Sequence, residues 1–600
     1  MRTGVLRALL RLFIGKRTVR EQRGSDRRTG WSVCAAHNEW IYNEPIVLFP
    51  SYPSYTLAYP CFLNLSLILF VVKQTLVTLT PGLATMAIEM LFSLSPAVLA
   101  VGLAILVSAY WFASYAYLYW LHPLSKYPGP PLAAISELWY ASAWTSGFWN
   151  RKIQDAHRRY GDIVRIAPNE LSFATAQAFR DIYGAPSKTR KLFPKSDRFY
   201  DNGHPNIAFV RDPEEHARQH RIFAPQFRPS AVRTQEPIIH AHVDLWVNQL
   251  AARGRDGAVS LDVSKWFEWL TFDIIGELTF GESFNATRDN KSHPWVSILL
   301  DATYSGSIFN LRKRLAFVGP LLRWMPYISP TARAAVDSIT RHGAMTLAKT
   351  RKRIEVGPAR SKTTGTDVDD FLAHAIRGGG MEDTDLANQA MVMLTAGAET
   401  SATALTAALW YLSLPDHAAC LQRLRAEVRA AFGTDGTSPG AANATGDATA
   451  RLPYLNAIIE ETMRLFPPSP VGPPRVSPVG GETVDGTFVP EGVYVAADVW
   501  TIHHDKRTVG EFPDKFMPER WLDVPVKPYT VPFSIGPRMC IGTTLAWVEM
   551  RIALAKTVLA FDWELDGDAI GGGDWVDQAR LKQLWKKAPL MMRFRPVGSV

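Results

Sequence analysis

The sequence predicts a mainly α-helical fold with small β-sheets. Long stretches after Leu132 repeat their apolar residues at helical spacing, whereas stretches that alternate with a period of two are short. Helix therefore outweighs strand. No internal repeat is visible, and we expect one large domain over residues 132–595.

Each expected element has a local reason. Residues 162–173 alternate around Pro168-Asn169, which predicts a β-hairpin. Residues 433–450 have low complexity, and residues 357–367 are rich in Gly, Ser and Thr, so both should be loops, the first a flexible surface insertion. Short strands are expected at 482–489 and 494–497. Helices are predicted from apolar periodicity over residues 237–252, 263–280, 332–354, 383–412, 417–432, 455–465 and 543–561.

The N-terminal part contains one long apolar stretch. Residues 91–121 contain no charged residue. The stretch is long enough to cross a hydrocarbon core of about 30 Å. Aromatic residues crowd the C-terminal end, as in an interfacial belt. We predict a transmembrane helix over 91–121 and a stiff proline-rich hinge over 122–131; the alternative is a buried core helix. Residues 1–85 are expected to be an unstructured extension or a start drawn too far upstream.

The composition narrows the class of protein. The chain is 47% hydrophobic and 20% charged, which is typical of a folded protein. A formal charge of +9 without a basic stripe of interleaved aromatics gives no support for nucleic-acid binding. It favours an acidic protein partner or an anionic membrane surface. No disulfide framework or zinc spacing is formed by the four cysteines, which are Cys34, Cys61, Cys420 and Cys540.

A loop before the last predicted helix has the residues that haem-iron ligation needs. Residues 533–542 read Phe-Ser-Ile-Gly-Pro-Arg-Met-Cys-Ile-Gly. Gly536 permits a turn, and Arg538 offers donors suited to a carboxylate. Gly542 lets the following helix approach a flat group, and the N-terminus of that helix favours the thiolate of Cys540. A thiolate can ligate haem iron; the alternative is a small buried cysteine in an ordinary turn.

This loop resembles the Phe-x-x-Gly-x-Arg-x-Cys-x-Gly signature of the cytochrome P-450 haem-thiolate monooxygenases. The resemblance covers about residues 125–595 and implies the cytochrome P-450 fold, with one catalytic domain behind an N-terminal anchor. It also implies that Cys540 is the axial ligand of the haem iron, that Arg538 meets a haem propionate and that Phe533 lies near the sulfur. The matching positions are Phe533, Gly536, Arg538, Cys540 and Gly542.

A second motif lies inside the helix predicted over 383–412. Residues 395–401 read Thr-Ala-Gly-Ala-Glu-Thr-Ser, and polar groups within an apolar helix are costly unless they are used. Ala396 and Gly397 leave room beside the backbone for a diatomic ligand. The Thr400 hydroxyl can bond back along the helix, and Glu399 can relay protons. The motif resembles the family's oxygen-binding segment, which implies that Thr400 steadies dioxygen while Glu399 supplies protons. A small polar patch on an amphipathic helix is the alternative.

A carboxylate and two arginines should tie the cysteine loop to the core. Glu461 and Arg464 lie one helical turn apart and can pair. Arg520 lies about twenty residues before the cysteine of the loop. The resemblance implies a structural triad of Glu461, Arg464 and Arg520 that holds the haem-binding core.

Three further residues are expected at the haem propionates by resemblance. Arg475 begins the strand region after the helix of the triad. His216 and His220 occupy the two named positions of the family's Trp-x-x-x-Arg helix, where this sequence departs from the pattern. The first replacement keeps a ring N–H donor, but the second gives up a permanent charge, for which Arg218 or Arg221 could compensate.

The expected partners follow from what the chain lacks and from the resemblance. No glycine-rich phosphate loop follows a strand, so electrons must come from another protein. The resemblance implies an NADPH-dependent flavoprotein reductase, often assisted by cytochrome b5, with dioxygen as oxidant and the catalytic domain on the cytosolic side of the endoplasmic reticulum. The motifs look most like fungal members of secondary metabolism, such as the trichothecene hydroxylases. An apolar terpenoid or polyketide is the expected substrate. The candidates for lining its pocket are Phe209, Met391, Leu394, Val471 and Trp585.

Two other functions remain open at this point. A haem-thiolate isomerase or dehydratase would rearrange a peroxide without a reductase, and the Glu399-Thr400 pair argues against it because such an enzyme does not activate dioxygen. A haem-binding sensor or membrane carrier would perform no catalysis, and Glu399 and Thr400 would then have no function.

Overall fold

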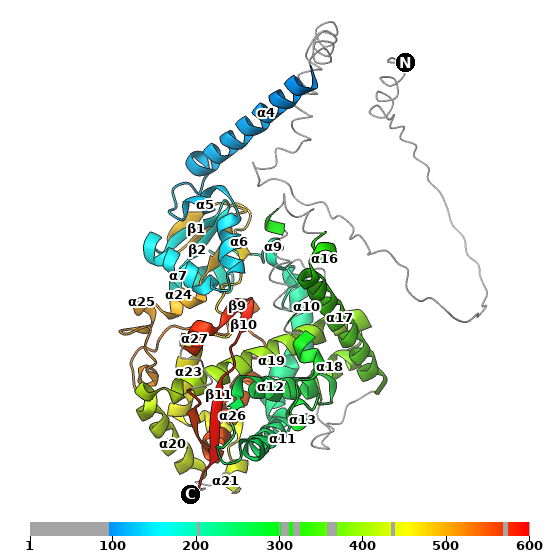
Figure 1. The fold of residues 1–600 in the computed structure, drawn as a ribbon, viewed down its shortest axis with the longest axis vertical. Helices are drawn as coiled ribbons and strands as arrows, with labels where there is room; N and C mark the ends of the chain where they lie inside the picture. Colours follow the sequence, from blue (N-terminus) through cyan, green and yellow to red (C-terminus); the bar gives the residue numbers. More distant parts are fainter. Residues whose placement is uncertain are drawn as a thin grey trace, which may run out of the picture. The chain divides into compact units, whose positions relative to one another are not determined.

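The structure is a computed structural model that describes residues 95–200, 205–298, 301, 311, 313–315, 324–356, 369–433, 439–567 and 574–598. Helices predominate among these residues, and the strands form four small sheets (Figure 1). The prediction of a mainly α-helical fold with small β-sheets is confirmed. The extension expected over residues 1–85 and the loop expected over 357–367 lie outside the described residues.

The helices that build the domain are spread along the whole described chain. The N-terminal ones are α4 Pro96–Ala116, the π-helix η1 Tyr117–Leu121, α5 Pro131–Ile135, α6 Leu138–Thr145, α7 Trp149–Tyr160, α8 Ala176–Tyr183, α9 Asp197–Tyr200, α10 Pro213–Phe223, η2 Ala224–Phe227, α11 Pro229–Gly254, α12 Val263–Phe280 and α13 Ala286–Asp289. They are followed by α16 Met325–Ile328, α17 Pro330–Val356, α18 Phe371–Gly378, α19 Asp383–Ser413, η3 Pro415–His417, α20 Ala418–Phe432, α21 Pro439–Ala442, α22 Gly446–Ala450, α23 Pro453–Leu465, α24 Val499–His503, α25 Lys506–Val509, η4 Pro518–Trp521, η5 Gly536–Arg538, α26 Thr543–Ala560 and α27 Trp575–Gln578.

Most predicted helices are present with small changes at their ends, but α11 begins earlier than expected. Its first residue is Pro229, and Pro237, taken as the start of the helix, lies inside it. An interior proline costs about 3 kcal/mol in a helix. The first turns nevertheless bury Val232 and Gln235, each 1% exposed, so packing offsets the cost.

The strands are short, and the largest sheet contains Arg475, one of the residues expected at the haem propionates. It has the strand order β1 Ile163–Ala167, β2 Glu170–Phe173, β7 Tyr494–Ala497 and β4 Arg475–Val476. The predicted hairpin is confirmed as the antiparallel pair of β1 and β2. The other sheets contain β3 Leu261–Asp262, β11 Met591–Pro596 and β8 Phe561–Leu565, then β9 Arg580–Lys582 with β10 Leu584–Lys586, and β5 Glu482–Val484 with β6 Thr487–Val489.

The single strand expected over residues 482–489 is wrong, because this stretch is a hairpin of β5 and β6. Asp485 and Gly486 join the strands with φ angles of 47° and 72°. Two consecutive residues with positive φ are what a tight hairpin turn requires, and Asp-Gly is a preferred pair for it.

The flexible surface insertion expected over residues 433–450 is also wrong in its second half. Helix α22 packs against α26, and Ala444 and Thr449 are completely buried. The Gly446 N–H donates to the Glu236 carboxylate at 2.9 Å. Because the residues of this low-complexity stretch are small, α22 can pack closely against α26.

Helix α12 packs closely against the middle of α19. A Cβ atom at Gly397 would lie 2.5 Å from Cδ1 of Ile275, so a larger residue would push the helices apart. At the same contact, the Thr271 hydroxyl of α12 donates to the Ala398 carbonyl of α19 at 2.7 Å. The middle of α19 is therefore fixed on the side that faces α12.

The stretch predicted to cross a membrane forms a continuous helical segment. Pro96–Leu121 is 26 residues long and is, within the described residues, apolar enough to span a bilayer. Helix α4 contains no buried residue, so it is not a core helix. The alternative of a buried core helix is therefore not supported.

The predicted hinge runs along the first sheet. The Pro128 carbonyl accepts from the Arg165 N–H at 2.9 Å, and the Arg165 guanidinium donates to the Leu118 carbonyl at 2.9 Å. A Cβ at Gly129 would lie 2.2 Å from the Arg165 carbonyl oxygen, which explains the glycine in this proline-rich run. Arg165 of β1 thus holds both the hinge, at Pro128, and the π-helix η1 before it, at Leu118.

The expected triad is present at the base of the cysteine loop. Glu461, on α23, accepts from Arg464 at 2.8 Å and from Arg520 at 2.9 Å, and both Glu461 and Arg464 are fully buried. The same carboxylate accepts from the Met517 N–H at 2.8 Å and the Trp521 indole at 2.9 Å. The two arginines also donate to backbone carbonyls of residues 503–515. One carboxylate therefore organises the whole approach to the loop.

Replacing this carboxylate should destabilise the protein strongly. In Glu461→Gln two buried guanidinium groups lose their counter-charge, which costs about 3–5 kcal/mol when one partner of a buried pair is removed. Denaturant unfolding of the haem-loaded protein measures the change. The control is Arg507→Gln, which breaks surface pairs with Asp162 and Asp505 and should cost about 1 kcal/mol or less. Equal losses in the two variants would contradict the role given to the triad.

Candidate active site

The cysteine loop is a closed turn whose shape depends on glycine. The Cys540 N–H donates to the Phe533 carbonyl at 2.8 Å and closes the loop. Gly536 has a φ of 73°, and a Cβ there would lie 2.2 Å from the Tyr183 carbonyl oxygen. Only glycine fits this position without a shift of backbone. Phe533 is half-buried, with its ring 6.5 Å from that of Trp547.

Arg538 fastens the loop to the start of α10. Its guanidinium donates to the carbonyls of Val210, Arg211 and Asp212 at 2.9, 3.0 and 3.3 Å. Burial and the neighbouring Arg475 lower the pKa of Arg538 to about 10. The residue expected to bind a carboxylate therefore also joins two distant segments.

The thiol of Cys540 is exposed although it lies deep in the domain. Burial raises its pKa above the usual value, and hydrogen bonds involving Gly542 and Thr543 oppose the rise. The groups at the N-terminus of α26 favour the thiolate, as the sequence predicts, but desolvation outweighs them in the net shift. A Cβ at Gly542 would come no closer to the sulfur than 3.8 Å. The sulfur is open to a ligand within a desolvated setting.

Four basic side chains gather beside the loop. The cations Arg538, Lys195 and Arg475 lower the pKa of His216 to about 3, after burial as the main cause. Burial, Arg475 and Arg538 lower the pKa of Lys195 to about 6. Burial is the largest cause of both shifts and the neighbouring cations add to it, so a bound anion would offset the repulsion within the cluster.

Arg475 shows most directly that this cluster fits a carboxylate ligand. The residue is 4% exposed and is placed by the pairing of β4 with β7. Its Nε is buried and has no hydrogen-bond partner. An unpaired buried guanidinium donor costs free energy unless a ligand accepts from it. Haem propionates are such acceptors, so the residues present fit the group that the resemblance implies.

The two histidines lie one turn apart on α10, with their rings 5.8 Å apart. His216 is buried, and His220 is half-buried. Arg218 does not compensate for the charge missing at His220, because Glu215 holds its guanidinium at 2.7 and 2.8 Å. Arg221 is exposed.

One face of α19 is open at the second motif. Ala396 is exposed and Thr400 is half-buried, although most of the neighbouring residues of the helix are buried. The Thr400 hydroxyl donates to the Ala396 carbonyl at 2.6 Å, as the sequence predicts. Gly397 is instead accounted for by packing against Ile275. The open surface on this helix therefore comes from Ala396 and Thr400.

Glu399 points away from the threonine beside it. Its carboxylate is 2% exposed, forms an ion pair with Lys587 and accepts from the Thr403 hydroxyl at 3.4 Å. Burial raises its pKa to about 7, with Lys587 acting against the rise and Glu268 adding to it. A carboxyl group that titrates near neutral pH can hold or release a proton under working conditions.

Sequence reasoning missed Lys195, Lys587 and Glu268. Each is a single charged residue outside any motif, brought to its place by chain segments far away in sequence. A hint existed only for Lys195, which lies in the basic stretch of residues 188–195. Among the expected pocket residues, Leu394 and Trp585 are buried in the core, at 0% and 2% exposure.

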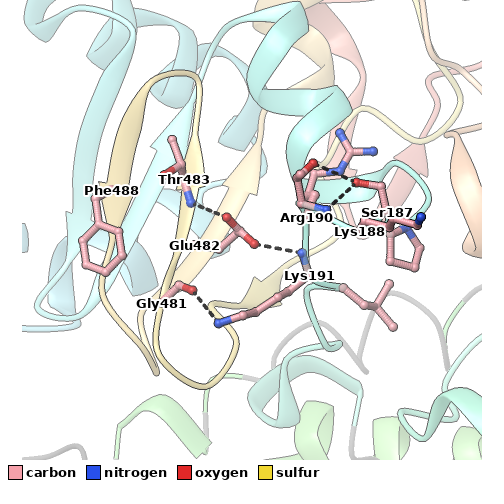
Figure 2. Close-up of a pocket in the computed structure, with 11 residues that line it drawn as sticks. Ser187, Lys188, Arg190, Lys191, Gly481, Glu482, Thr483 and Phe488 are labelled. Carbon is pink, nitrogen blue, oxygen red and sulfur yellow. Dashed lines mark hydrogen bonds between the residues drawn. The ribbon is translucent and has the colours of Figure 1, made fainter.

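A separate groove of about 520 Å³ lies at the surface beside the β5–β6 hairpin (Figure 2). The Lys191 side chain donates to the Val479 carbonyl at 2.8 Å, and Glu482 accepts from the Lys191 N–H at 2.8 Å across it. None of the motif residues lines this groove. It is therefore not part of the candidate active site.

Comparison with known proteins agrees with this geometry. The chain is 36% identical to the cytochrome P450 monooxygenase BOA3 of Botryotinia fuckeliana, over 79% of this chain and 92% of the relative. It is 35% identical to the cytochrome P450 monooxygenase astJ of Aspergillus oryzae, over 80% and 93%. Identity to the averantin hydroxylase of Dothistroma septosporum is 34%, over 80% and 88%. The family model for cytochrome P450 matches residues 128–571, and the chain belongs to the cytochrome P450 family.

Proposed function

We propose that this cytochrome P450 monooxygenase inserts one atom of dioxygen into an apolar small molecule, by hydroxylation or epoxidation, with Cys540 as the axial ligand of its haem iron. The observation that carries the proposal is the open thiol of Cys540 in a loop closed by Phe533. The family uses haem-thiolate iron as its cofactor, together with dioxygen, a substrate and an electron donor. Bound haem supplies the activation of dioxygen.

The chain's own residues would hold the haem from two sides. Cys540 supplies the sulfur, and Phe533, Gly536 and Gly542 shape its loop. The propionates would be received by the basic cluster, in which Arg475 has an unpaired donor and Lys195 is a buried amine that a bound carboxylate would favour in its charged form. The cluster consists of Arg475, Arg538, Lys195 and His216, with His220 one turn beyond.

Proton supply is assigned to two adjacent residues of α19. Thr400 lies on the open face, where its hydroxyl donates its single hydrogen to the Ala396 carbonyl. In this state the oxygen can accept from a ligand, and it can donate to one after the bond to Ala396 is broken. Glu399 holds a proton near neutral pH because its carboxyl group is buried. Gly397 lets α12 support this part of the helix without filling the open face.

The surroundings suggest how substrate and electrons arrive. We assign Pro96–Leu121 as a single membrane anchor of the endoplasmic reticulum, with the catalytic domain in the cytosol. The electron donor would be an NADPH-dependent flavoprotein reductase, assisted by cytochrome b5. An apolar terpenoid or polyketide of fungal secondary metabolism, as for the trichothecene hydroxylases, is the substrate class we propose. One relative is named a hydroxylase, which favours hydroxylation.

The ligand assignment predicts a spectral change in Cys540→Ser. Reduced wild-type protein should give the strongly red-shifted Soret band with carbon monoxide that an axial thiolate produces, and the variant should lose it because an alcohol does not replace the thiolate. The control is Cys420→Ser, at the other described cysteine, which should keep the band. A red-shifted band that survives in Cys540→Ser would overturn the assignment. Product formed with NADPH and reductase withheld would favour an isomerase or dehydratase.

Lys195 is predicted to retain the haem. In Lys195→Met one buried donor to a propionate is lost, and a hydrogen bond to a charged group contributes about 1.5–3 kcal/mol. The rate of haem transfer to a competing haem-binding protein should rise by about 10- to 100-fold. Lys191→Met, at an exposed lysine of the same segment, should leave this rate unchanged. Equal rates in both variants would remove Lys195 from the site.

Thr400→Ala should uncouple electron use from product. The variant keeps the helix but loses the hydroxyl on its open face, so proton delivery suffers, and such groups contribute about 10²-fold or more. The amount of product formed per NADPH consumed should therefore fall by at least about tenfold. The control is Thr406→Ala, whose hydroxyl is bonded back to Ala402 at 2.6 Å in the same helix. Unchanged coupling in Thr400→Ala would refute the proposed role.

A further inference from the structure

A buried cluster of three charges lies behind the oxygen-binding segment. Lys587 follows β10, and its side chain is 1% exposed. Its ammonium forms ion pairs with Glu399 and, at 3.2 Å, with Glu268 of α12, and it donates to the Thr403 hydroxyl at 3.2 Å. All three N–H donors of the lysine are therefore used.

The cluster is not an ordinary ion pair, because it has two carboxylates for one ammonium. A desolvated site with an uncompensated negative charge is costly, and binding one proton removes that charge. The Glu268 side chain is 17% exposed, whereas those of Glu399 and Lys587 are 2% and 1% exposed. Glu268 is thus the member of the cluster in contact with solvent.

The direction of the Glu399 side chain indicates what the cluster does. Its carboxylate is held by Lys587 and Thr403. The Thr400 hydroxyl, on the next residue, donates to the Ala396 carbonyl instead. The lysine therefore fixes the carboxyl group of Glu399 on the buried side of α19, away from the open face.

We propose that Lys587 and Glu268 are positioning residues for proton supply, and that they set when Glu399 carries the proton it delivers. This inference rests on the role proposed for Glu399. Lys587 holds the carboxyl group and favours its ionised form, whereas Glu268 opposes ionisation and faces the solvent. The two residues act on the same group in opposite directions.

The electrostatics of Glu399 agree with this division. Burial is the largest influence and raises its pKa to about 7. The charge and hydrogen bond of Lys587 lower the pKa, the charge of Glu268 raises it, and the Thr403 hydrogen bond lowers it. These are the groups that face Glu399 from α12, from α19 itself and from the segment after β10. Around neutral pH the cluster gains or loses one proton.

The test compares pH profiles of kcat for the full-length enzyme with saturating reductase and substrate. Wild-type kcat should fall as pH rises through the ionisation of Glu399, because the protonated acid is the active form. Lys587→Gln removes the charge that favours ionisation, so the fall should move to higher pH by about one unit. Glu268→Gln should move it to lower pH. KM should stay the same, because neither residue is placed at the substrate.

Infrared titration of the protonated carboxyl band, identified by its loss in Glu399→Gln, gives a readout without turnover. Lys586→Gln, at the exposed neighbouring lysine, is the control and should move neither the profile nor the band. Opposite displacements in Lys587→Gln and Glu268→Gln support the proposal. No displacement, or displacement in the same direction, overturns it.

Two outcomes keep this proposal separate from the role of Glu399. If Lys587→Gln does not give a folded haem protein, Glu268→Gln decides alone, because its side chain is partly exposed: a shift to lower pH supports the proposal, and its absence refutes it. If Glu399→Gln leaves kcat and coupling unchanged, the proposed role of Glu399 fails. The proposed effect of Lys587 and Glu268 on proton supply then fails as well. The infrared titration still shows whether these two residues control the charge of Glu399.

Discussion

The carboxylate of Glu461 is the point on which the geometry of the cysteine loop depends. It receives two guanidinium groups, a backbone N–H and an indole N–H, and so has no lone pair left for water. The arginines that it orients in turn satisfy carbonyls of a stretch with little regular structure of its own. A buried charge network of this kind stabilises one arrangement of irregular chain, because any other arrangement leaves charges unpaired.

Two further polar clusters differ from this one because their hydrogen bonds or charges are incomplete. The basic cluster around Arg475 has an unpaired donor and depressed pKa values, both of which a bound anion would offset. The cluster around Lys587 has one carboxylate too many, so it holds a proton near neutral pH. The triad is closed and structural, whereas the two incomplete clusters are suited to bind a ligand and a proton.

Sequence predicted the fold class, the long helices and the cysteine loop because those depend on local pattern. The φ of Gly536 and the back-bonded Thr400 are local features, and both could be anticipated from residue type. Lys587 could not be placed beside Glu399, since 188 residues separate them and no motif links them. The net thiol pKa of Cys540 could not be predicted for a related reason: the position of the helix can be read from the sequence, but the desolvation that dominates requires the packed domain.

Helix α19 shows how one element serves packing and chemistry at once. At Gly397 a missing side chain lets α12 approach, and Thr271 secures the contact by donating to the next carbonyl. On the following turn Thr400 remains on the open face while Glu399 is held on the buried side by Lys587. Successive residues of a helix are rotated by about 100°, so adjacent side chains necessarily face different surroundings. The Glu-Thr order therefore directs the Glu399 carboxyl group to the buried side of α19 and the Thr400 hydroxyl to the open face.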